Sequence, residues 1–293
     1  GVPLDHCKKI LVMPQYNEER TVVGVLESAS RFVDLVVVVN DGSTDSSPAL
    51  IDRWMQDKPH VILINLVANQ GMSGALLAGF CQVYRMMQQG VVGDDDIVVN
   101  IDADGQHRPD EIPHMIQAMT ESGADVLLAR RNLSGYPRFK QIGNRGLSRF
   151  TSLLTGVRYN DVECGFRFMR VRVVPGLLRY FTGKRYGCAQ EIGMITALLG
   201  FKINNDEPAN ITYYRPGARM RDGFTNVAMG LLAFARVRLN IRNDLDKLTA
   251  KVLGNADIRF SPALDWLRTA PDSRVITVQP PGVVETRART LGS

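Results

Sequence analysis

The chain has 293 residues, of which 45% are hydrophobic and 22% are charged, with a formal net charge of +5. This composition is typical of a globular protein with its own core, and it excludes a fibrous or disordered chain. The basic excess favours phosphates or anionic lipid over nucleic acid, because the sequence contains neither an RNP-like aromatic motif nor a zinc finger.

The four cysteines are scattered and form no C-x-x-C pair. Their spacing argues against a zinc site or a disulfide framework and fits a reducing compartment. No apolar stretch approaches the ~20 residues of a spanning helix, and no signal peptide is recognisable. We therefore expect a cytoplasmic protein that can make peripheral contact with the cytoplasmic face of a membrane.

Strand and helix patterns alternate through the first 131 residues. Apolar runs predict strands over 8–14, 34–41, 61–67, 96–102 and 124–131. Helical spacing predicts helices over 17–32, from the "GSTDSS" turn through Trp54, and over 69–90 and 109–123. Such alternation predicts an α/β fold with a mostly parallel central sheet flanked by helices.

The pattern loosens after residue 131. We expect a helix over 142–155, a short strand within 161–174, a helix and strand over 189–203, and an apolar helix over 224–240. The last of these either packs on the sheet or lies on a membrane surface. Residues 246–293 contain four prolines and no strong period, which predicts a peripheral C-terminal tail.

Three polar clusters, "PQYNEE", "NDGSTD" and "DADGQH", each follow a predicted strand. Ligands of parallel α/β sheets bind at the carboxyl ends of the strands, so these clusters favour a binding site over three ordinary turns. In the third cluster, Asp102 and Asp104 offer carboxylates and Gln106 a neutral oxygen to Mg²⁺ or Mn²⁺. By itself this D-x-D is a weak signal, and an ordinary polar turn would be the better explanation.

Taken together and in this order, the three clusters resemble the family 2 glycosyltransferases of the GT-A fold. The resemblance implies a nucleoside-diphosphate sugar donor, with Asp102, Asp104 and Gln106 at the metal and Asp104 in a catalytic role. It implies the following donor nucleotide-binding residues: Pro14, Tyr16, Asn17, Glu18, Asp41, Gly42, Ser43, Asn69, Gly74, Asp102 and Ala103. By contrast, neither GxGxxG nor GxxxxGK[ST] follows the first strand, which excludes a Rossmann or P-loop enzyme.

The segments "ADVLLARR", "GNRGLSRF" and "NDVECGFRFMR" are similar to polyprenyl-phosphate sugar synthases, such as the dolichol-phosphate mannosyltransferases. This likeness implies that the acceptor phosphate is held by Arg130, Arg145, Ser148, Arg149 and Arg215. Arginine suits this role because its planar fork binds phosphate in a bidentate manner. We expect Arg131, Arg138 and Arg172 to be solvated surface charges.

Hydroxyl-using members of this family carry a Glu-Asp pair where this chain has Cys188 and Ala189. A phosphate acceptor is already ionised near neutral pH and needs no general base, so this difference favours a lipid phosphate. Asp161, Glu191 and Arg130 are further candidate catalytic residues. Asp161 and Glu191 are candidate bases for a hydroxyl acceptor, and Glu191 is equally expected as an arginine partner that orders the site.

The resemblance predicts a metal-dependent, inverting glycosyltransferase with a GDP-mannose-like or UDP-glucose-like donor and a polyprenyl-phosphate acceptor. Transfer to the hydroxyl of a saccharide or secondary metabolite is the alternative enzyme, and a non-catalytic nucleotide-sugar-binding protein is the alternative of another class. We expect one glycosyltransferase domain over 1–245, with a nucleotide-sugar half over 8–131 and an acceptor half over 132–245. The sequence indicates no oligomeric state.

Overall fold

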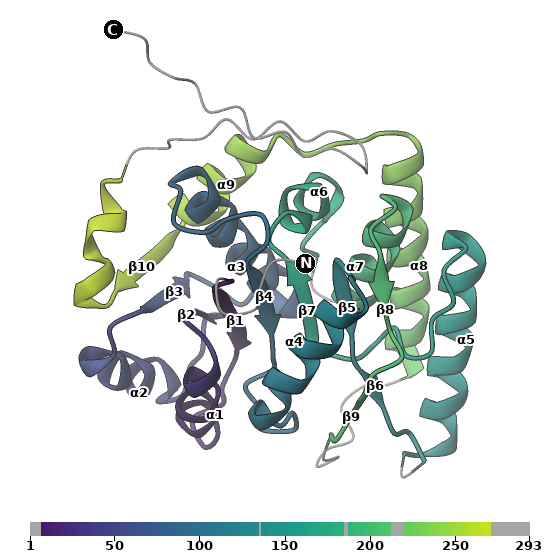
Figure 1. Ribbon diagram of the computed structural model, residues 1–293, viewed down its shortest axis with the longest axis horizontal. Coiled ribbons are helices and arrows are strands. Elements are labelled where there is room, and N and C mark those ends of the chain that lie inside the picture. The colour runs from purple at the N-terminus through teal and green to yellow at the C-terminus, as the bar shows by residue number, and fades with distance from the viewer. Residues whose placement is uncertain (1–6, 135, 185–186, 212–219, 271–293) are drawn as a thin grey trace, which may run out of the picture.

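The structure, a computed structural model, describes residues 7–134, 136–184, 187–211 and 220–270, with the side chains of 220–225 left out. One mixed sheet forms the centre and helices cover it (Figure 1). Its strands are β1 (Lys9–Gln15), β2 (Leu35–Asn40), β3 (Val61–Leu66), β4 (Ile97–Asn100), β5 (Val126–Leu128), β7 (Arg167–Arg170), β8 (Ile203–Asn204) and β10 (Ala256–Phe260). A separate ribbon pairs β6 (Arg130–Arg131) with β9 (Pro208–Ala209).

Most helices fall close to the predicted ranges, although several begin or end elsewhere, and the helices over 173–180 and 245–254 were not predicted. They are α1 (Val22–Ala29), α2 (Ser47–Trp54), α3 (Gly71–Gln88), α4 (Ile112–Glu121), α5 (Arg138–Thr155), α6 (Val173–Tyr180), α7 (Cys188–Leu198), α8 (Met220–Arg238) and α9 (Leu245–Gly254). Short 3-10 turns are η2 (Ser30–Phe32), η3 (Met55–Asp57), η4 (Pro109–Glu111) and η5 (Pro262–Arg268). Helix α5 starts four residues before the predicted 142 because Arg138 follows Pro137, whose fixed φ suits the residue preceding a helix.

The strand order is β10-β3-β2-β1-β4-β7-β5-β8. Strands β1 to β4 pair in parallel, as predicted, with Val12 opposite both Val37 and Asn100. Strand β7 lies antiparallel between β4 and β5, so a segment from the second half of the chain sits inside the first-half sheet. The predicted strand over 124–131 is two strands, because β6 leaves the main sheet to pair with β9.

Each face of the sheet supports its own hydrophobic core, and β1 supplies both by alternation. Ile10 and Val12 pack beneath α3, α6 and α7, whereas Leu11 and Met13 pack against α1, α2 and α4. All four side chains are fully buried. A strand with apolar side chains on both faces is what a sheet covered on both sides requires, and this explains the continuous apolar runs.

The predicted peripheral tail is corrected for its first part. Helix α9 packs on the same layer as α3, and β10 pairs antiparallel with β3, placing Ile258 opposite Ile64. Residues 246–260 therefore belong to the folded domain, with strand β10 at the left edge of the sheet in Figure 1 and α9 above α3. Residues 271–293 lie outside the described residues.

Helix α8, predicted as either a packed helix or a membrane-surface helix, buries part of one face. Ala233 is fully buried, and Gly230 lies against the Gln190 side chain of α7. Leu231 on the same helix remains exposed. Within the described part of the chain, no helix combines the length and apolar character needed to cross a membrane.

Candidate active site

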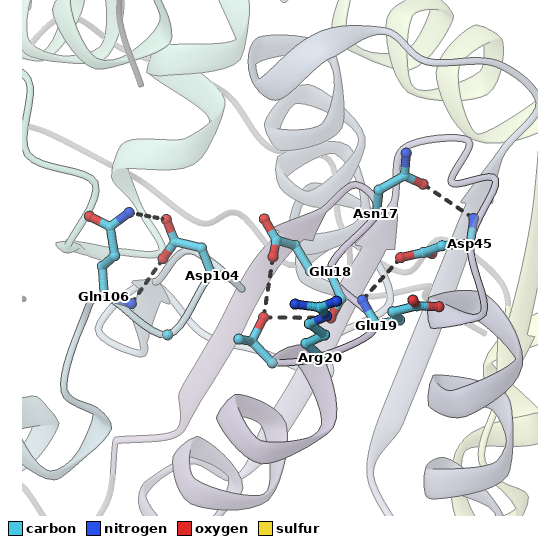
Figure 2. A pocket seen from close by; sticks show the side chains of 9 residues that line it. Asn17, Glu18, Glu19, Arg20, Asp45, Asp104 and Gln106 are labelled. Carbon is cyan, nitrogen blue, oxygen red and sulfur yellow. Dashed lines mark hydrogen bonds between the residues drawn. The ribbon is translucent and has the colours of Figure 1, made fainter. Parts of the chain in front are cut away.

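Six of the eleven predicted donor residues line one cleft at the carboxyl ends of β1, β2 and β4. A cleft of about 140 Å³ is lined there by Pro14, Tyr16, Glu18, Asp41, Asp102, Ala103 and Asp104, with Gln15, Met72 and Ala75. A second cleft of about 610 Å³ adjoins it and shares Glu18 and Asp104. In Figure 2, Asp104 and Glu18 approach this second cleft from two separate loops, whereas the Asn17 side chain turns toward Asp45.

The loop after β1 is locked to the loop after β2 through Asn17. Its side-chain Oδ1 accepts hydrogen bonds from the backbone N–H groups of Thr44, at 2.8 Å, and Asp45, at 3.3 Å (Figure 2). Its own N–H donates to Oγ of Ser43 at 2.9 Å. Asn17 also has a positive φ of 53°, a conformation that asparagine tolerates better than most residues. Asn17 and Ser43 therefore hold the shape of the site, and neither lines the smaller cleft.

Asp41 and Gly42 bring a third loop to the site. The Asp41 carboxylate is buried, and its Oδ1 accepts the backbone N–H of Gln70 at 2.6 Å. Gly42 has φ +69°, and a Cβ there would lie 2.7 Å from the backbone nitrogen of Asn69. The glycine therefore permits the 68–70 loop to pack against β2, which explains why Asn69 is near the site. Gly74 lies one turn into α3 and lines neither cleft.

Asp104 is oriented by its own loop. Its Oδ1 accepts the backbone N–H of Gln106 at 3.0 Å, and its Oδ2 accepts the Gln106 side-chain amide at 2.8 Å (Figure 2). Gln106 thus presents its amide nitrogen to Asp104, so the predicted Gln106 oxygen points away from this carboxylate (Figure 2). Gln106 positions Asp104 in this arrangement.

Asp102 has a partner that the sequence analysis did not identify. Nε2 of the buried His107 lies 3.3 Å from Asp102 Oδ2, and Nδ1 of His107 has no partner among the described residues. Burial raises the pKa of Asp102, but the His107 hydrogen bond and the charges of His107, Arg167 and Arg131 outweigh it, so the pKa is lowered. The carboxylate is therefore ionised near neutral pH. The only sequence signal was a histidine five residues after the first aspartate.

The second half of the chain closes over this acid. The loop that carries Gly165 crosses Asp102 so closely that a Cβ on Gly165 would lie 2.4 Å from Asp102 Oδ2. The next residues enter β7, where the buried Arg167 donates to Asn100 Oδ1 at 2.9 Å. The antiparallel insertion of β7 beside β4 thus brings a guanidinium and a glycine to Asp102.

The donor set fits a hard divalent cation. Mg²⁺ and Mn²⁺ in nucleotide enzymes are held by one or two carboxylates, with substrate phosphates and water completing the shell. Asp102 and Asp104 provide two such carboxylates in one cleft. Within the described residues, no three His, Cys, Asp or Glu side chains form a complete metal cage. The arrangement therefore suits a metal that binds together with a diphosphate.

Asp161, a candidate base, is held in a buried ion pair. Arg131 donates through Nε at 2.7 Å and Nη2 at 2.9 Å to the two Asp161 oxygens, and the Asp161 side chain is 1% exposed. The prediction that Arg131 is a solvated surface charge is therefore wrong. Burial lowers the Arg131 pKa, but Asp161 more than compensates and raises it overall. A carboxylate bound in this way is not available to remove a proton.

Glu191, the other candidate base, is fully buried on α7 and lines neither cleft. Its Oε1 accepts the Thr182 backbone N–H at 2.7 Å, and Oε2 has no partner among the described residues. Burial is the main cause that raises the pKa of Glu191 to about 7, opposed by the bonds from Thr182 and the charges of Arg236 and Lys184. This geometry favours an ordering role over proton removal.

Cys188 is at the position where the resemblance predicts an acid in hydroxyl-using members of the family. The thiol is buried, and burial raises its pKa, with Arg167 opposing the shift and Asp102 adding to it. These charges act on Cys188 because the N-terminus of α7 lies close to Asp102 and Arg167. The position holds a neutral thiol instead of a carboxylate.

The predicted acceptor-phosphate residues form a separate group on α5. Arg145, Ser148 and Arg149 line a surface cleft of about 610 Å³ together with Arg158. Ser148 is buried, and its Oγ accepts the Val162 backbone N–H at 3.3 Å, which ties α5 to the loop after Asp161. Arg130 is exposed at the start of β6 and lines none of the three clefts. Arg215 lies outside the described residues.

The comparisons with known proteins agree with this architecture. Residues 10–177 match the model of the family described as Glycosyl transferase family 2. The chain therefore belongs to this family, and it is a glycosyltransferase with the GT-A fold, as predicted.

Two relatives illustrate the similarity. A UDP-N-acetylglucosamine–dolichyl-phosphate N-acetylglucosaminyltransferase of Methanococcus voltae is 29% identical over 78% of this chain and 93% of its own length. An undecaprenyl-phosphate mannosyltransferase of Micrococcus luteus is 27% identical over 66% of this chain and 79% of its own.

One solved structure illustrates the likeness in fold. It is glucosyl-3-phosphoglycerate synthase of Mycobacterium tuberculosis, in complex with Mn²⁺, UDP-glucose and phosphoglyceric acid. It aligns with a TM-score of 0.55 and 18% identity, covering 79% of this chain and 81% of that chain.

Proposed function

We propose that the protein transfers a sugar from a nucleoside-diphosphate sugar to a polyprenyl phosphate, in a metal-dependent and inverting reaction. One observation carries the donor half of this proposal. Asp102 and Asp104 share a cleft with Pro14, Tyr16 and Asp41, so carboxylates for a metal–diphosphate and a surface for a nucleobase lie side by side. The relatives named above as polyprenyl-phosphate transferases support the acceptor half.

Asp102 and Asp104 would hold Mg²⁺ or Mn²⁺ against the donor diphosphate, and Gln106 and His107 would orient these carboxylates. When bound, the metal supplies positive charge beside the diphosphate as it leaves the sugar. The solved relative with Mn²⁺ and UDP-glucose is consistent with this choice of metal. The loops of Tyr16 and Asp41, which line the cleft, would select between a GDP-mannose-like and a UDP-glucose-like donor.

The residues around the site fit an acceptor that is already ionised and needs no general base. A phosphate oxygen of the lipid would attack the anomeric carbon while the bond from that carbon to the diphosphate breaks, with inversion. Asp161 is occupied by Arg131, Glu191 is buried behind the Thr182 backbone, and Cys188 is a neutral thiol. None of the three presents a carboxylate to the cleft, and an ionised phosphate needs none.

We further propose that Arg145, Ser148 and Arg149 serve the acceptor side, together with Arg130 at the start of β6 and with Arg215, which lies outside the described residues. The three α5 residues line one cleft with Arg158, and none of the described residues that line it is acidic. Such a cleft attracts anions, and arginine matches phosphate oxygens in a bidentate manner. A protein of this kind would work at the cytoplasmic face of a membrane, where its acceptor's phosphate lies at the headgroup level.

The test compares two acceptors that differ only in the phosphate. The purified protein is incubated with labelled nucleotide sugars, Mn²⁺, and either undecaprenyl phosphate or undecaprenol in detergent. We expect an acid-labile glycosyl phospholipid from the phosphate and no product from the alcohol. Transfer to the alcohol, giving an acid-stable glycoside, would support the hydroxyl-acceptor alternative, and nucleotide-sugar binding without any transfer would support a non-catalytic role.

A further inference from the structure

Helix α5 carries large apolar side chains on its solvent-facing side. Phe139, Ile142 and Leu153 are 52%, 68% and 84% exposed. Their spacing of three and eleven residues places them along one stripe of the helix, because a helix completes a turn every 3.6 residues. The opposite face, with Asn144, Leu147, Ser148 and Thr151, is buried against the protein.

The charged side chains of α5 are all basic. Its 18 residues include four basic side chains and no acidic one. Arg145 and Arg149 lie one turn apart next to the apolar stripe, and they line the α5 cleft with Arg158 and Leu153. Among the described residues, none of these three arginines has an acidic partner within ion-pairing distance, whereas Arg131 and Arg172 are both paired.

We propose that this surface, formed by Phe139, Ile142, Leu153, Arg145, Arg149 and Arg158, docks the protein on an anionic lipid bilayer. The three apolar side chains enter the acyl boundary, and the arginines meet lipid phosphates at the headgroup level. A helix in the plane of the interface needs an apolar stripe bordered by basic residues, and α5 meets both requirements without a spanning segment. An acidic protein partner would match the arginines but leave the apolar stripe without a complement.

Docking through α5 would also orient the site relative to the membrane. If α5 lies on the bilayer, the arginine cleft is at the depth of lipid phosphates, and the buried Ser148 connects this helix to the loop of Asp161 and Gly165. Docking would therefore present the acceptor side of the protein to membrane lipids. Docking depends on α5 and the neighbouring Arg158, and it holds whether or not a polyprenyl phosphate is the acceptor.

The experiment is co-sedimentation of the purified chain with vesicles that contain neither polyprenyl phosphate nor nucleotide sugar. Phosphatidylcholine mixed with phosphatidylglycerol is compared with phosphatidylcholine alone. We expect binding to the anionic vesicles, reduced by about tenfold or more in the triple variant Phe139→Ser, Ile142→Ser, Leu153→Ser and in Arg145→Glu, Arg149→Glu. High salt should weaken binding because it screens the arginines.

The matched control is Val67→Ser with Trp266→Ser, which removes exposed apolar side chains outside α5 and should bind like wild type. The single variant Ile142→Ser serves if the triple variant unfolds, since that side chain is 68% exposed. Unchanged melting temperature verifies the fold of each variant. Absence of wild-type binding to anionic vesicles, or wild-type binding by the α5 variants, would overturn the proposal. Because no acceptor is present, this outcome is independent of whether transfer occurs.

Discussion

Nε2 of His107 lies 3.3 Å from Oδ2 of Asp102, and the histidine side chain is almost completely buried. Because the ionised Asp102 carboxylate can only accept a hydrogen bond, the ring donates to it through Nε2, and Nδ1 has no partner among the described residues. The ring also packs on Phe166, with 5.5 Å between centroids. The hydrogen bond from His107 therefore orients the Asp102 carboxylate and favours its ionised state, and Phe166 holds the histidine ring in place.

Replacement of His107 should weaken the metal site without unfolding the protein. In His107→Ala, Asp102 loses the donor that orients it, so we expect the Mn²⁺ concentration for half-maximal activity to rise about tenfold or more. His107→Gln, whose amide can donate to the same oxygen, should recover part of this loss. His114→Ala, on the exposed surface of α4, is the control and should leave the Mn²⁺ requirement unchanged. An unaltered requirement in His107→Ala would contradict the positioning role.

A methyl group at Gly165 should displace Asp102. The added Cβ would lie 2.4 Å from Oδ2 and 3.1 Å from His107 Nε2, which forces the carboxylate to move. A shift of about 1 Å in a reacting group can lower the rate about a hundredfold, so we expect Gly165→Ala to lower kcat by that order. Gly24→Ala is the control, since a Cβ there meets nothing within 4 Å. Wild-type kcat in Gly165→Ala would show that Asp102 tolerates displacement.

Loss of Arg131 should destabilise the fold. Arg131→Ala leaves the nearly fully buried Asp161 without its partner, which costs about 3–5 kcal/mol in the free energy of unfolding. The control is Arg108→Ala, which breaks an ion pair with Asp110 whose side chains are more than half exposed, so its effect on stability should be far smaller. Denaturant unfolding measures both. Equal effects in the two variants would mean that the Arg131–Asp161 pair behaves like a surface pair.

Glu191 should make the protein less stable as the pH rises. Its pKa is raised to about 7 in the folded chain from 4.5, so the folded state binds the proton more tightly than the unfolded state. The resulting stabilisation is complete below about pH 4.5 and is lost as the pH rises through 7. The free energy of unfolding falls by about 3 kcal/mol at most over this range.

Glu191→Gln cannot titrate, so the variant should lose less stability than wild type between pH 5 and pH 8. The measurement is the difference in unfolding free energy between these two pH values, which cancels any constant effect of the amide. Parallel pH profiles for wild type and variant would show that Glu191 does not carry a raised pKa.

Local signals were sufficient for the first half of the fold. Strands β1 to β4 are continuous apolar runs, a pattern that predicts strands buried on both faces of a parallel sheet. The polar clusters that follow such strands must lie at the same edge of the sheet. The predicted Pro14, Tyr16, Glu18 and Asp104 do line one cleft. Parallel topology converts positions in the sequence directly into positions in space, which is why this half of the site could be predicted.

Pairings between distant segments could not be predicted. The antiparallel insertion of β7, and the addition of β10 to β3, depend on contacts that no local pattern records. These pairings also decide the fate of neighbouring charges. Arg130 and Arg131 are adjacent in sequence, yet the strand alternation of β6 exposes Arg130 and turns Arg131 to the buried Asp161. His107 was missed because its role arises only when the Gly165 and Phe166 loop covers it.

The central claim is that the cleft of Asp102 and Asp104 binds a nucleoside diphosphate together with a divalent metal. The most direct measurement is the thermal shift produced by GDP, UDP and dTDP, each with and without Mn²⁺, in wild type and in Asp104→Asn. We predict that Mn²⁺ markedly increases the shift in melting temperature for at least one nucleotide in wild type and that Asp104→Asn abolishes this increase. A ligand at a hundredfold excess over its Kd stabilises the folded state by about 2.7 kcal/mol, so the shift is large enough to measure. Equal shifts with and without Mn²⁺ for all three nucleotides, or a full Mn²⁺ effect in Asp104→Asn, would contradict it.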